Sequence, residues 1–174
     1  LNILIMKKIV IAILLMAGSV VTQAQTKDYT RDVQSVDAIM HALYDVISGD
    51  PGVARDWDRF RFLFKSDARL IPSRKDDKGN FELRAISPEE YVHLFSSRIS
   101  SGFFERELSR KEDAYGTVVH VFSTYETKEK NDGPVTNRGI NSIQLFKDQH
   151  RYYIVNIFWC AESLGFPLPD KYLK

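Results

Sequence analysis

Three side chains in the C-terminal part of the chain have the chemistry for general acid–base catalysis: His120, Tyr125 and Glu162. Histidine is the side chain most easily tuned to act as a base near neutral pH, and His120 lies in an apolar, strand-like run. Glu162 is the best acidic candidate near the mouth of a pocket. Two of the three also have a structural interpretation. His120 is then a hydrogen-bonded group within a strand, and Glu162 is the ion-pair partner of Arg138 or Arg69.

Metal binding and nucleophilic catalysis have little support in the sequence. His41, His93 and His150 stand alone, and there is no HExxH motif or paired His/Asp spacing, so we predict no metal site. Cys160 is the single cysteine and lies in an apolar run, which favours a small buried hydrophobic residue over a nucleophile. We predict no cofactor, and a lone cysteine excludes an internal disulfide.

The first 24 residues have the pattern of a secretory signal peptide. Met6-Lys7-Lys8 is a short basic region, residues 9–16 are an unbroken apolar run, and Thr22-Gln23-Ala24 places small residues at a cleavage site before Gln25. The apolar run is too short to span a bilayer. Residues 1–5 precede a natural start at Met6. We therefore expect export to the periplasm or beyond the cell, with an anchoring N-terminal helix as the alternative.

The charge of the chain after cleavage argues against two classes of partner. Removing the two lysines of the signal leaves 22 basic against 23 acidic side chains over 150 residues. No basic footprint for nucleic acid or for a membrane surface remains. This length is normal for one domain, and we expect residues 25–34 to be a flexible polar segment before a single domain at residues 35–174.

Helical patterns precede a long series of strands. The predicted helices begin at Ser35, Asp56 and Ser87, each of which can cap the residues that follow. They cover residues 35–48, 56–64 and 87–100. Strand patterns with turn residues between them cover residues 68–72, 81–86, 103–111, 115–127, 138–146 and 152–162. Helices followed by a strand meander indicate an α+β fold.

This order, together with several short motifs, resembles the nuclear-transport-factor-2-like (NTF2-like) superfamily, also called SnoaL-like or ketosteroid-isomerase-like. The motifs are Trp57-Asp58-Arg59-Phe60, residues 68–72, 120–126 and 138–145, and Trp159 with Glu162. They are similar to a group of bacterial members that mostly lack an assigned activity. The resemblance implies an α+β cone, in which N-terminal helices pack on a strongly curved antiparallel sheet. It also implies a pocket between the two.

The implied pocket predicts a set of ligand-binding residues. Aromatic groups from two helices and polar groups from the middle of strands meet only inside the cone. The expected lining is Trp57, Tyr91, Phe95, Tyr125, Asn141 and Trp159, with His120 or Glu162 nearby. Strand alternation places Val119, Val121, Ser123 and Tyr125 on one face, and His120 and Phe122 on the other. The sequence leaves open which face is concave.

Three functions fit these observations. The first is an exported domain that binds a small, largely apolar ligand without catalysis. The second is a lyase, isomerase or hydrolase that uses His120, Tyr125 or Glu162. The third is a structural or partner-binding module whose pocket is filled by its own side chains. Ketosteroid-isomerase-like catalysis also needs an aspartate base. Tyr44 is a possible donor, but no aspartate lies on the matching late strand, and this absence favours the first function.

The strands also predict a homodimer. Bulky apolar residues occur on both alternation sets of the sheet, and a single helical layer covers only one face. Monomers rarely keep a large exposed apolar patch, so we expect two copies to pair through the open face of the sheet. The alternative is that the tail at residues 163–173 covers the patch with its own apolar side chains: Leu164, Phe166, Leu168 and Tyr172.

Overall fold

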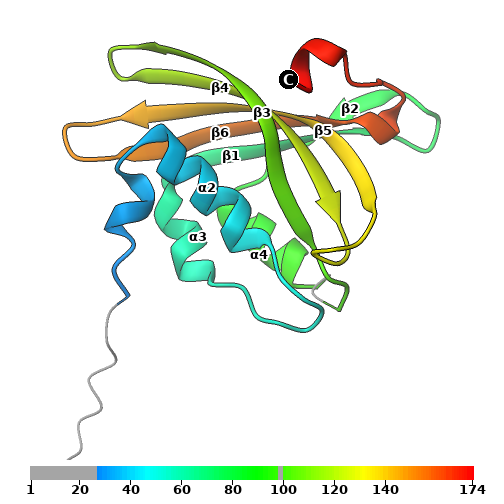
Figure 1. Ribbon diagram of the computed structural model, residues 1–174, viewed down its shortest axis with the longest axis horizontal. Coiled ribbons are helices and arrows are strands. Elements are labelled where there is room, and N and C mark those ends of the chain that lie inside the picture. The colour runs from blue at the N-terminus through cyan, green and yellow to red at the C-terminus, as the bar shows by residue number, and fades with distance from the viewer. Residues whose placement is uncertain (1–26, 98–99) are drawn as a thin grey trace, which may run out of the picture.

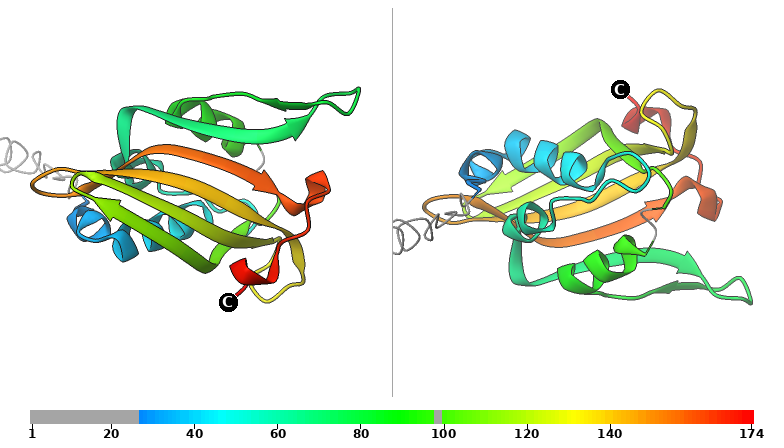
Figure 2. Two further views of the ribbon diagram at one scale, coloured as in Figure 1. Left: turned by 90° about the horizontal axis from the view of Figure 1, so that it is seen from above. Right: turned by 90° about the horizontal axis from the view of Figure 1, so that it is seen from below.

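The computed structural model describes residues 27–97 and 100–174. A single six-stranded sheet, in the order β2-β1-β6-β5-β4-β3, carries helices on one of its faces (Figures 1 and 2). The signal segment at residues 1–24 lies outside the described residues, so export stays a prediction. Within the described ranges, every helix is too short or too polar to cross a membrane.

The helices start where the capping residues predict. Ser35, Asp56 and Ser87 each accept a hydrogen bond through the side chain from a backbone N–H three residues on. All three predicted helices are confirmed. Their bounds, and those of the three short 3-10 segments, are η1 (Thr30–Val33), α2 (Val36–Ile47), α3 (Trp57–Leu63), α4 (Pro88–Ser96), η2 (Glu162–Leu164) and η3 (Asp170–Tyr172).

The end of the polar N-terminal segment differs from the flexible stretch expected at residues 25–34. Residues 30–33 form the turn η1, and Val33 is fully buried beneath it. Asp32 pairs with Arg59 of α3 at 2.6 Å, and Tyr29 donates to Asp56 at 2.9 Å. These partners lie 27 residues away along the chain, so the local composition gave no sign of them.

The sheet is mixed rather than wholly antiparallel. Its strands are β1 (Phe64–Lys75), β2 (Phe81–Leu83), β3 (Phe104–Tyr115), β4 (Val118–Lys128), β5 (Val135–Lys147) and β6 (Tyr152–Ala161). Strands β3 to β6 form an antiparallel meander, but β1 pairs with β6 in parallel. The expectation of an antiparallel sheet was therefore wrong at this one pair, because strand patterns do not specify the partner of a strand that is distant in sequence.

Burial along β4 identifies the concave face. Val119 is 3% exposed and Val118 is 60% exposed, so the set containing Val119, Val121, Ser123 and Tyr125 faces the helices. The core forms where apolar residues of α2 meet this face: Ile39, Met40 and Leu43 against Val121, Ile143 and Leu145. Seen from above, the three α-helices lie behind the sheet (Figure 2, left). The core therefore occupies a single side of the sheet.

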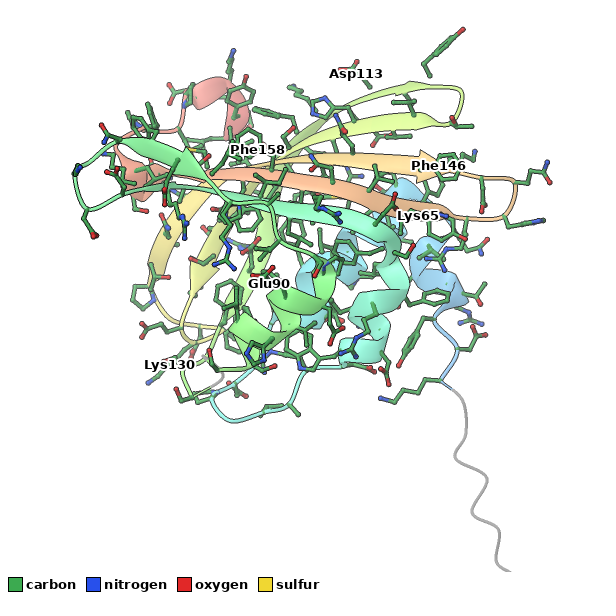
Figure 3. All side chains as sticks on the ribbon, turned by 180° about the vertical axis from the view of Figure 1, so that it is seen from behind. Lys65, Glu90, Asp113, Lys130, Phe146 and Phe158 are labelled. Carbon is green, nitrogen blue, oxygen red and sulfur yellow. The ribbon has the colours of Figure 1, made fainter. Side chains whose placement is uncertain are left out.

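The C-terminal tail covers part of the opposite, convex face. The Tyr172 ring packs on Phe122 at 5.3 Å, and the Tyr172 carbonyl accepts a hydrogen bond from Ser109. Phe166 packs on Phe81 at 5.2 Å. Figure 3 shows Phe158 on the side of the sheet opposite Glu90 of α4, and Phe158 stays 40% exposed. The tail thus takes up part of the covering that the sequence left open, and the homodimer stays a prediction.

A glycine on β5 makes room for a large residue on β4. Tyr125 lies opposite Gly139 in the ladder, and a Cβ at Gly139 would come within 2.5 Å of both the Tyr125 hydroxyl and the Cys160 carbonyl oxygen. The Tyr125 ring can therefore lie across β5 only because that position has no side chain. Gly139 thereby sets the position of a residue that the sequence placed in the pocket.

We expect Gly139→Ala to lower the free energy of unfolding by about 1–3 kcal/mol, because the added methyl group overpacks a filled site. Urea denaturation measures the loss. Gln144→Ala changes an exposed residue of the same strand and should stay within about 0.5 kcal/mol of the wild type. Equal stability of the two variants would show that the close approach at Gly139 imposes no constraint.

Candidate functional site

A cavity of about 350 Å³ lies between the concave face of the sheet and the helices. Six of its fourteen lining residues are aromatic: Phe60, Tyr91, Phe95, Phe103, Tyr125 and Trp159. Several of these rings pack on one another. Phe60 stacks on Tyr91 at 5.3 Å, Tyr91 stacks on Phe95 at 5.5 Å, and Phe95 meets Phe103 edge-on at 5.2 Å. The wall is therefore held in place by its own contacts.

Five of the six residues expected around one pocket line this cavity. They are Tyr91, Phe95, Tyr125, Asn141 and Trp159. Trp57, the sixth, lies behind the wall and packs edge-on against Phe60 at 5.8 Å and Phe95 at 5.7 Å. Trp57 thus supports the wall and does not belong to the lining.

The two remaining candidates do not line this cavity, although Glu162 directly follows the lining residue Ala161. His120 belongs to the convex alternation set, where its Nε2 lies 3.0 Å from Ser142 Oγ. Glu162 forms an ion pair with Arg138 at 2.9 Å and accepts a hydrogen bond from the Leu168 backbone. The structural interpretation therefore describes the contacts of both residues. His120 lies on the face away from the cavity, because alternation shows which residues share a face but not which face is concave. A catalytic role for His120 or Glu162 stays a prediction.

Glu162 instead borders a separate cavity of about 420 Å³ beneath the C-terminal tail. Phe122, Ile140 and Phe158 of the sheet form its floor, and Phe166 and Leu168 of the tail help to close it. This cavity is lined almost wholly by apolar groups, and its one carboxylate is already paired with Arg138.

The acidic residue of the cone cavity is Glu105, which the sequence analysis missed. Glu105 lies on β3, and its Oε1 accepts a hydrogen bond from Asn141 Nδ2 at 3.3 Å. Burial raises the pKa of Glu105 to about 7, and the Asn141 hydrogen bond lowers it in part. Two adjacent phenylalanines precede Glu105 and two charged residues follow it, so no alternation of apolar and polar residues marked its inward face.

A chain of hydrogen bonds connects this region to helix α2. Asn141 Nδ2 also donates to Tyr44 Oη at 3.1 Å, and Tyr44 Oη lies 2.7 Å from Ser123 Oγ. Ser123 donates its single hydroxyl proton to Glu107 at 2.6 Å, so Tyr44 must donate to Ser123. Burial, and then the charge of Glu105, raise the pKa of Tyr44. Tyr44 is therefore a neutral group with its proton already committed.

Tyr125 is the hydroxyl that remains available in the cavity. Its side chain is 4% exposed, and no hydrogen bond joins its oxygen to another described residue. The oxygen is not fully enclosed, because Thr124 Oγ1 is the one fully buried side-chain atom without a partner in the part of the chain that the structure describes. Burial is the main reason that the pKa of Tyr125 is raised, and the nearby charge of Glu105 adds to it. The Tyr125 hydroxyl is thus neutral and open to the cavity, where it can donate a hydrogen bond to a bound molecule. Tyr125 and Glu105 therefore present a donor and an acceptor to the cone cavity.

A second, more polar cavity of about 520 Å³ runs between α2 and β3 and shares Glu105 with the first. Ion pairs line it, including Arg106 with Glu126 at 2.7 Å and Arg110 with Glu107 at 2.8 Å. Glu105 thus lines two cavities: this polar one, which we call the outer cavity, and the aromatic cone cavity. Among residues 27–97 and 100–174, no group of three or more His, Cys, Asp or Glu side chains is placed to hold a metal ion.

Comparison with known proteins identifies the fold. No protein-family model and no curated protein match the chain. An NTF2-like protein from Cytophaga hutchinsonii is 15% identical with a TM-score of 0.52, covering 72% of this chain and 96% of its own. An NTF2-like protein of unknown function from Silicibacter pomeroyi is 12% identical with a TM-score of 0.50, over 72% and 91%. The yeast UBP3-associated protein BRE5 is 13% identical with a TM-score of 0.51, over 72% and 92%. The chain therefore has the NTF2-like fold, as its motifs and element order predict.

Proposed function

We propose that the protein binds a small, largely apolar molecule in the cone cavity, through a polar group that contacts Glu105 and Tyr125. The observation that carries this proposal is an open volume of about 350 Å³ lined by Glu105, which has no basic partner among the described residues, and by Tyr125, whose hydroxyl is not hydrogen bonded to another described residue. A ligand with one polar group would find a hydrogen-bond donor and an acceptor there. Concave, aromatic-lined sites with few polar groups are typical of small-molecule binding.

The state of the aromatic side chains favours a ligand pocket over a filled core. The rings of Phe60, Tyr91 and Phe95 pack in a row along one wall and leave the centre of the cone open. Apolar surface buried against this wall contributes roughly 25 cal/mol per Å² to binding. The ring stacking holds the wall in place before a ligand enters, so little ordering is lost on binding.

A second candidate function is acid–base catalysis, centred on Glu105 instead of His120 or Glu162. A carboxyl group with a pKa of about 7 can take up or release a proton near neutral pH. Tyr125 could donate a hydrogen bond to an oxygen that gains charge, while Glu105 removes a proton from the bound molecule. This would be a lyase, isomerase or hydrolase reaction with Glu105 as the base. We rank it second because Glu105 alone has the pKa expected of an acid–base group in this cavity.

Cavity filling tests the site. We expect the neutral fluorescent probe N-phenyl-1-naphthylamine to bind the wild type saturably, with one site per chain. Ala161→Leu places extra bulk in the cone cavity. It should weaken binding by roughly 5- to 160-fold, because an overpacking cost of about 1–3 kcal/mol corresponds to that range of Kd.

The matched control is Ala114→Leu, the same change at an exposed position of β3, which should leave the Kd unchanged. Circular dichroism confirms that both variants are folded. If both bind the probe like the wild type, the probe occupies another place, such as the cavity beneath the tail, and the proposed site is wrong.

Glu105 should also make stability depend on pH. Its pKa rises from 4.5 to about 7 on folding, so the native state holds a proton that the unfolded chain has released between these values. Stability is therefore full below pH 4.5 and falls as pH rises to about 7, by roughly 3 kcal/mol. Glu105→Gln should remove this loss.

Urea denaturation of the wild type and Glu105→Gln at pH 5 and pH 8 measures the difference. Glu129→Gln, at an exposed position after β4, is the control and should retain the pH dependence of the wild type. The same fall in stability in Glu105→Gln and in the wild type would assign it to other groups, among them Glu107, whose pKa burial also raises.

The proposal that the protein is exported depends only on the signal-like segment at residues 1–24. We infer that protein recovered from outside the cytoplasm of its native cell begins at Gln25, after cleavage behind Thr22-Gln23-Ala24. Intact-mass spectrometry measures the N-terminus directly. A mass that includes Lys7 and Lys8 would contradict cleavage.

A further inference from the structure

We propose that the polar group recognised in the cone cavity is a protonated amine, so that the ligand class is small apolar or aromatic amines. This rests on the proposed function and specifies the chemistry of that same site. Three features of the cavity carry the inference: its charge balance, its aromatic faces and its hydrogen-bond acceptors.

The cavity contains a carboxylate without a basic partner, so a bound cation would balance its charge. Within the described ranges, Glu105 is the one charged residue in the lining, and no basic side chain pairs with it. Nearby carboxylates differ in this respect: Glu107 pairs with Arg110 at 2.8 Å and Glu126 with Arg106 at 2.7 Å. The protein supplies Glu105 only with an amide hydrogen bond from Asn141, at 3.3 Å. A buried carboxylate that lacks a counter-charge is costly, and a cationic ligand would supply one.

The aromatic wall also favours a cationic ligand over a neutral or an anionic one. Ring faces carry negative partial charge and attract ammonium groups within about 6 Å. Tyr91, Phe95 and Trp159 line the cavity that contains Glu105. A protonated amine gains from the carboxylate and from the rings together. An anion is repelled by both, and a neutral hydroxyl gains only from the carboxylate.

The free acceptors also fit an ammonium group, which has three N–H donors and no acceptor. Glu105 offers carboxylate oxygens, and the Tyr125 oxygen has no partner among the described residues. Asn141 uses its amide N–H groups toward Tyr44 and Glu105, and its carbonyl oxygen accepts no hydrogen bond from the part of the chain that the structure describes. These three residues therefore provide three acceptors in one lining.

The outer cavity that shares Glu105 has an excess of acidic groups. Five carboxylates line it, against three basic side chains: Asp37, Asp45, Glu105, Glu107 and Glu126 against Arg106, Arg110 and Lys128. Asp45 is paired with Arg59 outside the lining, so Glu105 is the one of these five carboxylates without a basic partner among the described residues. A carboxylate of this kind in a cleft attracts cations. A cation that approaches between α2 and β3 would thus meet a favourable potential before it reaches Glu105.

Three probes with one carbon skeleton separate the possibilities: 4-phenylbutylamine, 4-phenylbutanol and 4-phenylbutyrate. By isothermal titration calorimetry at pH 8, we expect the amine to bind the wild type at least tenfold more tightly than the alcohol, with the carboxylate weakest. Glu105→Gln should lower the amine affinity to that of the alcohol and change the alcohol affinity less than threefold. Glu129→Gln is the matched control and should preserve the order of the three.

The pH dependence of wild-type binding tests the same inference without a variant. Amine affinity should fall several-fold from pH 8 to pH 5.5, as Glu105 takes up a proton, while alcohol affinity stays level. Tyr44, Tyr125 and Glu107 surround Glu105, and His41 and Asp45 line the outer cavity. A pH dependence that persists in Glu105→Gln would assign the effect to one of those groups and overturn the role of Glu105.

The remaining outcomes are also decisive. Alcohol or carboxylate affinity equal to or above that of the amine overturns the amine inference and leaves small-molecule binding in place. An amine preference that survives Glu105→Gln in a folded variant likewise overturns it. If none of the three probes binds the wild type at millimolar concentration, and N-phenyl-1-naphthylamine does not bind either, the proposed function itself fails.

Discussion

The hydrogen bonds that run from Asn141 through Tyr44 to Ser123 fasten helix α2 to the middle of the sheet. Tyr44 reaches across the interior from α2 and meets β4 at Ser123 and β5 at Asn141, at 2.7 and 3.1 Å. All three residues are buried, so each depends on the others for its hydrogen bonds. A buried polar cluster of this kind is favourable only when its members are satisfied. It therefore specifies one position of α2 over the sheet, and with it the width of the cone.

The same hydrogen-bond cluster explains why the cavity is polar at one end and aromatic at the other. Asn141 uses the same amide group for Tyr44 and for Glu105, so the cluster that holds α2 also positions the cavity carboxylate. The aromatic wall comes from α3, α4 and the chain before β3, and it is held by ring stacking. Two different kinds of interaction thus build the two ends of the site.

On the convex face, polar side chains pair with one another and the C-terminal tail covers apolar ones. There His120 bonds to Ser142 and Glu162 bonds to Arg138, and the tail lays Tyr172 on Phe122. These contacts satisfy polar groups near the surface and cover apolar ones. Two of the three residues with acid–base chemistry in the sequence, His120 and Glu162, therefore contribute to hydrogen bonding and ion pairing. The residue with the perturbed pKa, Glu105, lies on an edge strand of polar composition.

Short-range physics determined much of this protein from the sequence alone. Capping by Ser35, Asp56 and Ser87 set the helix starts, and the period of two along β4 set which residues share a face. Only the tertiary structure decided which face is concave, that β1 runs parallel to β6, and that Glu105 points inward. A register shift after Glu107 interrupts the alternation of β3, and adjacent Phe103 and Phe104 show no alternation before Glu105, so no local pattern carried that information. The burial that raises the pKa of Glu105 exists only once α2, β4 and β5 surround it, which makes it a property of the assembled fold.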